Sequence, residues 1–245
     1  MKAFLFLLCS LIYINSFSQN CSSHYLFTNG VTLEYSYSMA QRDGTEAKNQ
    51  RIRYEVQEVV DRDGSTYSTV VKKGISINDD DGFYKRAIDI KCDGKNLYFP
   101  YDFYTPDIIY AKDMEPKNRR TKAGSYVFSY EPLKDVITYI VPLVMDGITK
   151  LPEGATQVKL KGKSAYMAGT DFESEIAIKS IKLTGKEPVK TEAGTFDCYK
   201  FYVISTQKIN KLDMDVKYWL YFNKELGLVK LDMPGGGMEL TSIKK

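Results

Sequence analysis

The stretch LDMDVKYWLYF, residues 212–222, decides the fold class of this chain. Its even-numbered positions are all apolar or aromatic, whereas Asp213, Asp215 and Lys217 occupy the positions between them, followed by Trp219 and Tyr221. Successive side chains of a β-strand point to opposite faces, so a period of two is typical of a half-buried strand and not of a helix. The stretch therefore predicts a long β-strand.

The same alternation recurs along most of the chain. Strands are predicted at 31–39, 51–57, 66–72, 83–92, 125–130, 156–162, 172–184, 196–207 and 227–233. In the segment 172–184 the apolar phase changes between Ile178 and Ile181, which predicts a β-bulge. Only 132–150 could hold a short helix, and Pro142 would interrupt it.

The turn residues agree with these strands. Asp-Gly pairs at 63–64, 81–82 and 93–94, and the stretch from Asn223 to Gly227, are typical of hairpin turns. Hairpin turns at this spacing favour strands that pair with their neighbours in sequence. We therefore predict an all-β fold with little helix: a single curved antiparallel sheet, or a meander that forms a partial or closed β-barrel.

The N-terminus has the pattern of a secretory signal peptide. Lys2 precedes an apolar run from Phe4 to Ile14, and Ser16-Phe17-Ser18 is typical of a cleavage site. We predict a signal peptide at 1–18 and one β domain at 19–245, with a possible internal division near 125–155. No second apolar segment of about 18 residues follows, so no transmembrane segment is expected in the mature chain. The predicted location is the periplasm or the cell surface.

Export affects how the cysteines are interpreted. Cys9 leaves with the signal peptide, and Cys21, Cys92 and Cys198 remain in a compartment that permits disulfides. Three thiols allow at most one intramolecular bridge. We favour Cys21 with Cys92, and Cys92 with Cys198 stays open as the alternative. Cys198 lies in KTEAGTFDCYKFYVIS, residues 190–205, where an apolar setting would raise the thiol pKa and argues against a nucleophile.

Most enzyme chemistries lack their usual residues here. His24 is the single histidine of the chain, so histidine triads and multi-histidine zinc sites are excluded. The segment Gly162-Lys163-Ser164 lacks the upstream glycine of a phosphate-binding loop. The acidic run 78–82 fits a turn better than a calcium loop. We predict no catalytic residue, no metal site and no cofactor.

The charged residues give two weaker alternatives. Asp213 and Asp215 share one strand face, so a carboxylate-based hydrolase is the least favoured hypothesis. The formal charge of the whole chain is +3 and falls to +2 without Lys2, which does not favour nucleic acid. The basic run 117–122 is interpreted as a solvated loop.

Several short stretches together resemble the TapB-like exported proteins of Bacteroidota, which are related to a domain family of unknown function. They are a leader ending in Ser-Gln, Cys21 with Tyr25, Gly30, Glu34 and Tyr35, IKCDGKNLY at 90–98, TEAGTFDCYK at 191–200, YWLY at 218–221 and GLVK at 227–230. The resemblance implies a curved, mostly antiparallel sheet or partial barrel that is exported. It supplies no catalytic residues, and the aromatic and basic insertion at 98–122 departs from the pattern.

The sequence leaves two main hypotheses on function. In the first, a non-enzymatic exported protein binds an apolar or amphipathic small molecule in the concave face of its sheet. The candidate ligand-binding residues are Tyr101, Phe103, Tyr104 and Trp219, although segment 98–110 could instead pack over an open barrel end. In the second, an interaction or structural protein of the cell envelope binds a partner protein, which predicts a filled core and an exposed apolar patch.

Overall fold

A computed structural model of the chain describes ten stretches of residues. They are 21–39, 50–76, 79–100, 103–104, 108–109, 128–132, 138–143, 157–164, 171–209 and 212–245. The predicted signal peptide, the basic run 117–122 and the candidate residue Tyr101 lie outside these stretches.

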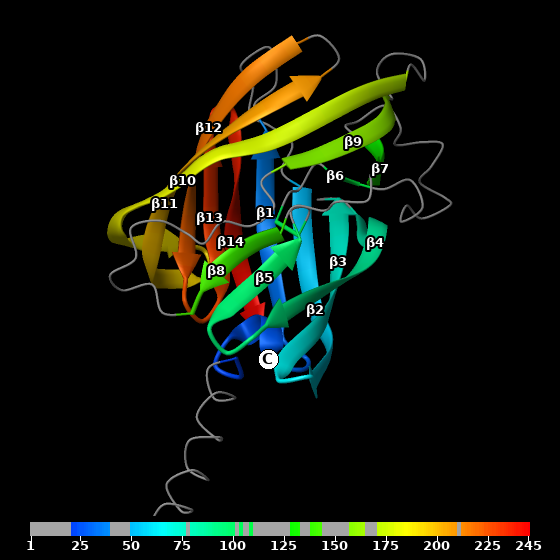
Figure 1. Ribbon diagram of the computed structural model, residues 1–245. Helices are drawn as coiled ribbons and strands as arrows, with labels where there is room; N and C mark the ends of the chain where they lie inside the picture. The colour runs from blue at the N-terminus through cyan, green and yellow to red at the C-terminus, as the bar shows by residue number, and fades with distance from the viewer. Residues whose placement is uncertain are drawn as a thin grey trace, which may run out of the picture.

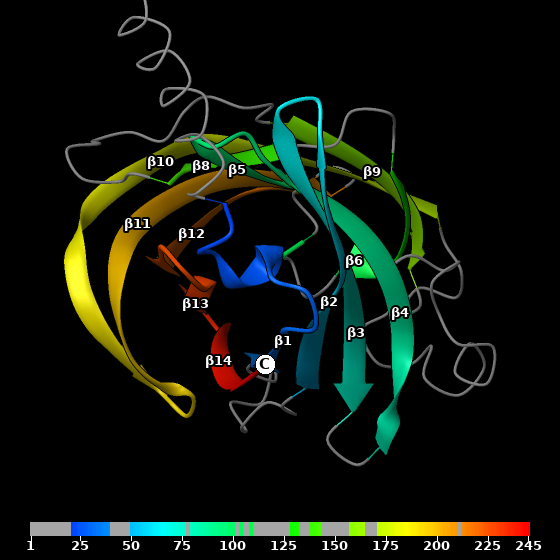
Figure 2. The ribbon, with the colours of Figure 1, turned by 90° about the horizontal axis from the view of Figure 1, so that it is seen from below.

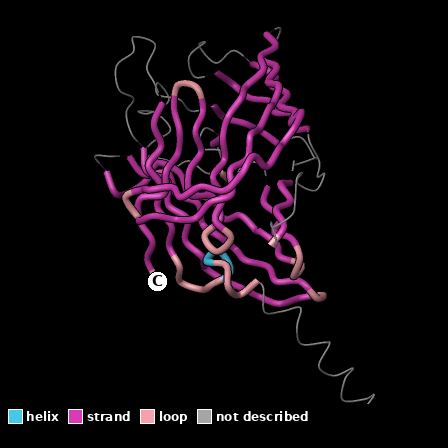
Figure 3. Tube along the Cα trace, turned by 90° about the vertical axis from the view of Figure 1, so that its left-hand side faces the viewer, coloured by secondary structure: helices cyan, strands magenta, loops and turns pink. Residues whose placement is uncertain are grey.

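Strands make up nearly all of the described chain (Figure 3). Strands β1 to β5 are Thr32–Met39, Gln50–Arg62, Ser65–Ser76, Asp79–Cys92 and Asn96–Pro100. Strands β6 to β9 are Ile108–Ile109, Phe128–Pro132, Thr138–Pro142 and Gln157–Ser164. Strands β10 to β14 are Asp171–Thr191, Gly194–Ile209, Leu212–Asn223, Gly227–Met233 and Gly236–Lys244. A short 3-10 helix, η1, spans Tyr25–Phe27 and lies ahead of β1.

The described strands form a single sheet that curls into a half-barrel (Figures 1 and 2). The strand order is β6-β7-β9-β10-β11-β12-β13-β14-β1-β2-β3-β4-β5-β8. Neighbouring strands are antiparallel except for β6 and β7, which are parallel. Each strand predicted from the alternation coincides at least in part with an observed strand, and the predicted all-β fold class is confirmed.

The bulge predicted in the segment 172–184 is present as well. The register of β10 against β11 shifts between Ile178 and Ser180. A second shift follows between Leu183 and Gly185. Each extra residue increases the local twist. The two shifts therefore help β10 and β11 to follow the strong curvature that Figure 2 shows at this side of the sheet.

Three of the four predicted turns are confirmed. Asp63 has a φ of 53° and Gly64 a φ of 71°, so both central residues of the β2–β3 turn adopt the left-handed conformation that an Asp-Gly hairpin turn requires. Gly94 and Gly227 also have positive φ, at 81° and 86°. The turn predicted at 81–82 is wrong, because these residues lie inside β4. Pairing of β3 with β4 extends to Ser76 and Asp79, so the chain has already reversed before Asp81.

The short helix considered within 132–150 is replaced by a strand where the structure describes this segment. Strand β8 pairs with β5, and Pro142 is its last residue, opposite Asn96. A proline at a strand end removes no hydrogen bond from the interior of the ladder. Strands β5, β6, β8 and β14 were not predicted. Strand β14 was missed because it begins in a run of three glycines, 235–237, that is typical of a loop. The internal division near 125–155 stays a prediction.

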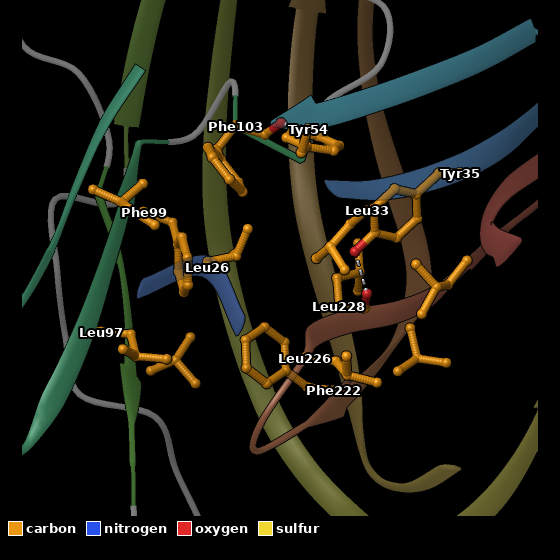
Figure 4. Packing of buried hydrophobic residues seen from close by; sticks show 14 of the residues in the cluster. Leu26, Leu33, Tyr35, Tyr54, Leu97, Phe99, Phe103, Phe222, Leu226 and Leu228 are labelled. Atoms are coloured by element: carbon orange, nitrogen blue, oxygen red, sulfur yellow. Dashed lines mark hydrogen bonds between the residues drawn. The ribbon is translucent and has the colours of Figure 1, made fainter. Parts of the chain in front are cut away.

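The hydrophobic core fills the concave side of the half-barrel (Figure 4). Leu33, Tyr35 and Tyr37 alternate along β1 and are all buried in the core. On the other face of this strand, Ser36 and Ser38 are half-buried and Glu34 is buried. The helix η1 contributes Leu26 and Phe27 from within the curl of the sheet (Figure 2). Aromatic side chains also pack in this core, and they include two of the predicted ligand-binding residues, Phe103 and Tyr104.

Candidate functional site

Phe103 is a packed core residue in the centre of an aromatic cluster. The interior aromatic cluster comprises Tyr54, Phe99, Phe103, Tyr104 and Phe222. The Phe103 ring centroid lies 4.9 Å from that of Tyr54 and 5.4 Å from that of Phe99, and its side chain is fully buried. The Tyr54 hydroxyl donates to the Phe103 carbonyl oxygen at 2.6 Å, which fixes the backbone of this short segment against β2.

Tyr104 packs edge-on against Phe103 and reaches the β12–β13 turn. Its phenol oxygen accepts a hydrogen bond from the Leu228 amide at 3.4 Å, and burial raises the pKa of the phenol. A Cβ at Gly227 would lie 2.5 Å from this oxygen, so glycine leaves the space that Tyr104 occupies. The Tyr35 hydroxyl donates to the Leu228 carbonyl at 2.7 Å, so two tyrosines hold the same turn.

Trp219 is not a member of the interior aromatic cluster. It packs beside Tyr202, with ring centroids 4.6 Å apart, and the Lys200 ammonium lies 4.8 Å from its ring centroid. Strand alternation places Trp219 on the face opposite to Leu220 and Phe222. The structure therefore brings two of the predicted ligand-binding residues, Phe103 and Tyr104, together in the core and separates Trp219 from them. A ligand-binding role for these residues stays a prediction.

His24 is buried beside the hydrophobic core. It is fully buried at the start of η1, and its Nδ1 accepts a hydrogen bond from the Leu26 amide at 3.2 Å. Nδ1 is therefore unprotonated and the neutral ring carries its proton on Nε2, for which the described part of the chain offers no acceptor. Burial lowers the pKa of the imidazole to about 3. A neutral, desolvated ring beside Phe27 is suited to packing.

The buried imidazole predicts a loss of stability in mild acid. The unfolded chain takes up a proton at His24 below about pH 6.5, whereas the folded chain does so only near pH 3. The free energy of unfolding should therefore be highest above pH 6.5 and fall as the pH drops from 6.5 towards 3, by about 2 kcal/mol at pH 5. Urea unfolding at pH 7.5, 6 and 5 measures this change.

His24→Asn is the matched control for the acid effect. The asparagine side-chain oxygen can accept from the Leu26 amide as Nδ1 does, but the side chain does not titrate in this range. Because His24 is the only histidine of the chain, stability of the variant should be nearly flat between pH 7.5 and 5. An equal pH dependence in both proteins would rule out His24 as its source.

The three cysteines of the mature chain have distinct environments. Cys21 and Cys92 form a disulfide with a Cα–Cα distance of 6.0 Å, which ties the segment before η1 to the end of β4. This is the pairing that the sequence favoured over Cys92 with Cys198. Cys198 is a buried free thiol whose pKa is raised to about 12 by burial first and then by Asp197 and Glu187. Such a thiol is protonated at neutral pH and is a poor nucleophile.

The carboxylates of β12 form surface interactions. Asp215 accepts hydrogen bonds from the Lys179 ammonium at 2.7 Å and from the Thr206 hydroxyl at 3.1 Å, and these bonds lower its pKa. A glycosidase acid needs a raised pKa instead. Asp213 is exposed on the same strand. Within the described stretches, no group of three or more His, Cys, Asp or Glu side chains could hold a metal ion.

A groove of about 330 Å³ lies over β14 on the outer face of the sheet, opposite the core. We call it the β14 groove. Its lining comprises Ser36, Ser38, Glu192, Lys230, Leu231, Asp232, Gly236, Gly237, Met238, Glu239 and Thr241. Strand β14 lies between β13 and β1, and the turn between β10 and β11 supplies Glu192 from a strand pair that is distant in the sheet order.

The floor of the β14 groove is a glycine. Gly237 is paired with Asp232 of β13 on one side and Ser38 of β1 on the other, so two polar side chains flank a position without one. The next outward position, Glu239, is paired with Lys230 and Ser36 in the same way. A Cβ at Gly237 would lie 2.6 Å from the Leu231 carbonyl oxygen, so the close approach of β13 and β14 also requires glycine.

Sequence reasoning missed the β14 groove because it depends on long-range pairing. The stretch 235–237 is typical of a loop, and no local pattern shows that Gly237 lies between Asp232 and Ser38. The one available signal was the alternation of Glu239 and Thr241 with Met238 and Leu240. That alternation predicts a strand with a polar face, but not what the face adjoins.

Comparisons with known proteins agree with this architecture. A family model described as DUF3108-like matches residues 146–242, a segment that includes most of β9 to β14. No curated protein gives a match. The resemblance to TapB-like proteins stays a prediction, while the relation to a domain family of unknown function is supported over this segment.

Two solved structures share the fold. One is a protein of Bacteroides fragilis described as exported and as having a YmcC-like fold, with 14% identity, a TM-score of 0.62, and coverage of 91% of this chain and 99% of that one. The other is a protein of Parabacteroides distasonis described as a lipoprotein, with 15% identity, a TM-score of 0.64, and coverage of 90% and 97%. At this identity the likeness establishes the fold. In the described residues, no helix is long and apolar enough to span a membrane.

Proposed function

We propose that this chain is an exported, non-enzymatic binding protein of the cell envelope that contacts a partner protein through the outer face of its sheet. The observation that carries the proposal is the filled concave side: η1 and the interior aromatic cluster occupy the space where a ligand would lie. Two proteins of the same fold are described as exported and as a lipoprotein, which supports an envelope location here.

The packing argues against an apolar ligand in the interior. Small-molecule sites are typically clefts of roughly 300–1,000 Å³ lined by apolar side chains. Phe99 and Phe103 are fully buried and lie within van der Waals range of their aromatic neighbours, with centroid separations of about 5 Å. A ligand in this place would have to displace side chains that close-pack the core, which costs several kcal/mol for each large residue.

The titratable groups argue for a non-catalytic role. The single histidine is buried with a lowered pKa, and the free thiol is buried with a raised pKa, so neither supplies a base or a nucleophile at neutral pH. The Asp215 carboxyl, from the pair that a hydrolase would need, has a lowered pKa. Together with Asp213, these are the groups that the sequence analysis considered for chemistry.

The described surface favours a polar contact over an apolar one. The interaction hypothesis included an exposed apolar patch, but the exposed large hydrophobic residues of the described chain are Val60, 43% exposed, and Met214, 38% exposed. They lie on β2 and β12, which are separated by three strands in the sheet order. Single apolar residues of this kind are normal on a surface. We therefore infer that the partner recognises polar and charged groups.

Native mass spectrometry of the mature protein, purified from a bacterial periplasm, tests the proposal. We expect the bare chain, lighter by two hydrogens because of its single disulfide, before and after denaturation with organic extraction. A bound apolar molecule that is present in the native spectrum and lost on denaturation would overturn the proposal. It would restore the ligand-carrier hypothesis and identify the class of ligand.

A further inference from the structure

We propose that the β14 groove is the docking site for a basic side chain, an arginine, of the envelope partner. This inference rests on the proposed function and adds to it the place of contact and the chemistry of the partner. The groove combines a hollow with an excess of negative charge in its lining.

The hollow is large enough to admit one long side chain. Its volume of about 330 Å³ is at the lower end of the range of small-molecule sites, and its floor is the Gly237 backbone. This space is sufficient for an arginine stem with its guanidinium. The floor is held by β13 and β1 on its two sides, so the groove is preformed.

The lining carries an excess of negative charge. Glu192, Asp232 and Glu239 approach from the β10–β11 turn, β13 and β14, and the one basic residue is Lys230. The Lys230 ammonium lies 3.9 Å from the Asp232 carboxylate and offsets one charge, which leaves a formal net charge of −2 for the lining. Hydroxyl groups of Ser36 and Ser38 on β1 and of Thr241 on β14 add acceptors to the lining.

Elsewhere on the outer face, neighbouring carboxylates form ion pairs with basic side chains of the same sheet. The excess of acids in the lining of the β14 groove contrasts with this pattern. The carboxylate of Glu34 on β1 lies 3.2 Å from the guanidinium of Arg51 and 3.3 Å from that of Arg53. Glu55 of β2 lies 2.6 Å from the Lys73 ammonium. The sheet thus matches acids with bases on adjacent strands, but around Gly237 acids outnumber bases, as an external cation would require.

Arginine suits this geometry better than lysine. A guanidinium presents five donors in a planar fork and can bind carboxylates on two sides at once. The groove offers carboxylates from separate elements, Glu239 on the floor strand β14 and Glu192 on the turn between β10 and β11. A lysine ammonium is a point charge and would gain less from this arrangement.

The test is a titration of the mature, isotope-labelled protein with the acetylated and amidated peptide Gly-Arg-Gly, followed by amide chemical shifts in NMR spectra. We expect shifts that cluster at Gly237 and Glu239, and at least a tenfold weaker affinity for the same peptide with citrulline, an uncharged analogue of arginine. Binding of both peptides with equal affinity, or shifts confined to other strands, would overturn the proposal.

The double variant Asp232→Asn/Glu239→Gln should weaken arginine-peptide binding at least tenfold. Its matched control is Glu58→Gln/Asp63→Asn, which removes the same charge from exposed positions at the β2–β3 end of the sheet and should leave the affinity unchanged. Equal losses in both variants would mean attraction by net charge alone and would overturn the site. If the groove variant does not fold, Glu192→Gln in the exposed turn replaces it, with an expected loss of at least threefold.

The two proposals can fail separately. An apolar molecule bound in native mass spectra overturns the proposed function whatever the peptide does. A bare chain whose groove does not respond to the arginine peptide overturns only the docking site.

Discussion

Replacing Phe103 with alanine is expected to destabilise the protein by about 3–5 kcal/mol. Its ring is fully buried between Tyr54, Phe99 and Tyr104, and the short segment that carries it is held to β2 by the Tyr54 hydroxyl. Truncation would leave a cavity that the surrounding sheet can close only in part. Equilibrium unfolding in urea at pH 7.5 measures the change.

The control for this prediction is Val60→Ala. Val60 is 43% exposed on β2, so its truncation should change the free energy of unfolding by no more than about 0.5 kcal/mol. If Phe103→Ala were as mild as Val60→Ala, Phe103 would not be a core residue. It would then be available to line a ligand site, and this result would favour the hypothesis that the protein binds an apolar ligand in its interior.

Removing the disulfide is expected to lower the free energy of unfolding about as much as Phe103→Ala does. The bond joins residues 71 apart in sequence, and the chain-entropy relation gives about 4 kcal/mol for a closed loop of this length. The double variant Cys21→Ala/Cys92→Ala should unfold at a correspondingly lower urea concentration. Measured values for native disulfides scatter between about 2 and 5 kcal/mol, and a result in this range agrees with the prediction.

Two controls separate the cross-link from other effects. Reduction of the wild-type protein with a phosphine should lower its stability to that of the double variant and should leave the variant itself unchanged. Cys198→Ala, which removes a buried thiol outside the bridge, should cost far less and should keep the sensitivity to reduction. A reduced wild-type protein as stable as the oxidised one would contradict the prediction.

Much of the fold could be predicted because its signals are local. The alternation in 212–222 and the Asp-Gly pair at 63–64 each depend on side-chain direction or backbone conformation within a few residues, and both are present as predicted. The turn at 81–82 failed because pairing of β3 with β4 overrode the local preference. Strand β14 was missed because its glycines are favourable only between two particular neighbouring strands.

The candidate site was predictable only in its parts. An aromatic excess near 98–110 pointed to an interior role, and Phe103 and Tyr104 do lie inside the half-barrel. The sequence grouped Trp219 with them, whereas strand alternation and the contact with Tyr202 place it on another face. The alternation around Glu239 predicts only a strand with a polar face, and the β14 groove itself could not be predicted, since its lining comes from residues more than 190 positions apart, such as Ser38 and Gly237.

By itself, the sequence determined the class of this protein: strands, from the period of two, and turns, from Asp-Gly pairs and the stretch from Asn223 to Gly227. The same residues excluded histidine-based chemistry, because one histidine cannot supply it. Only the tertiary structure decided that the concave side is filled and that the outer face holds an acidic hollow. The physical reason is that the burial of a side chain and the charges around it depend on which residues lie opposite it on the neighbouring strands. This register is set by contacts across the whole sheet.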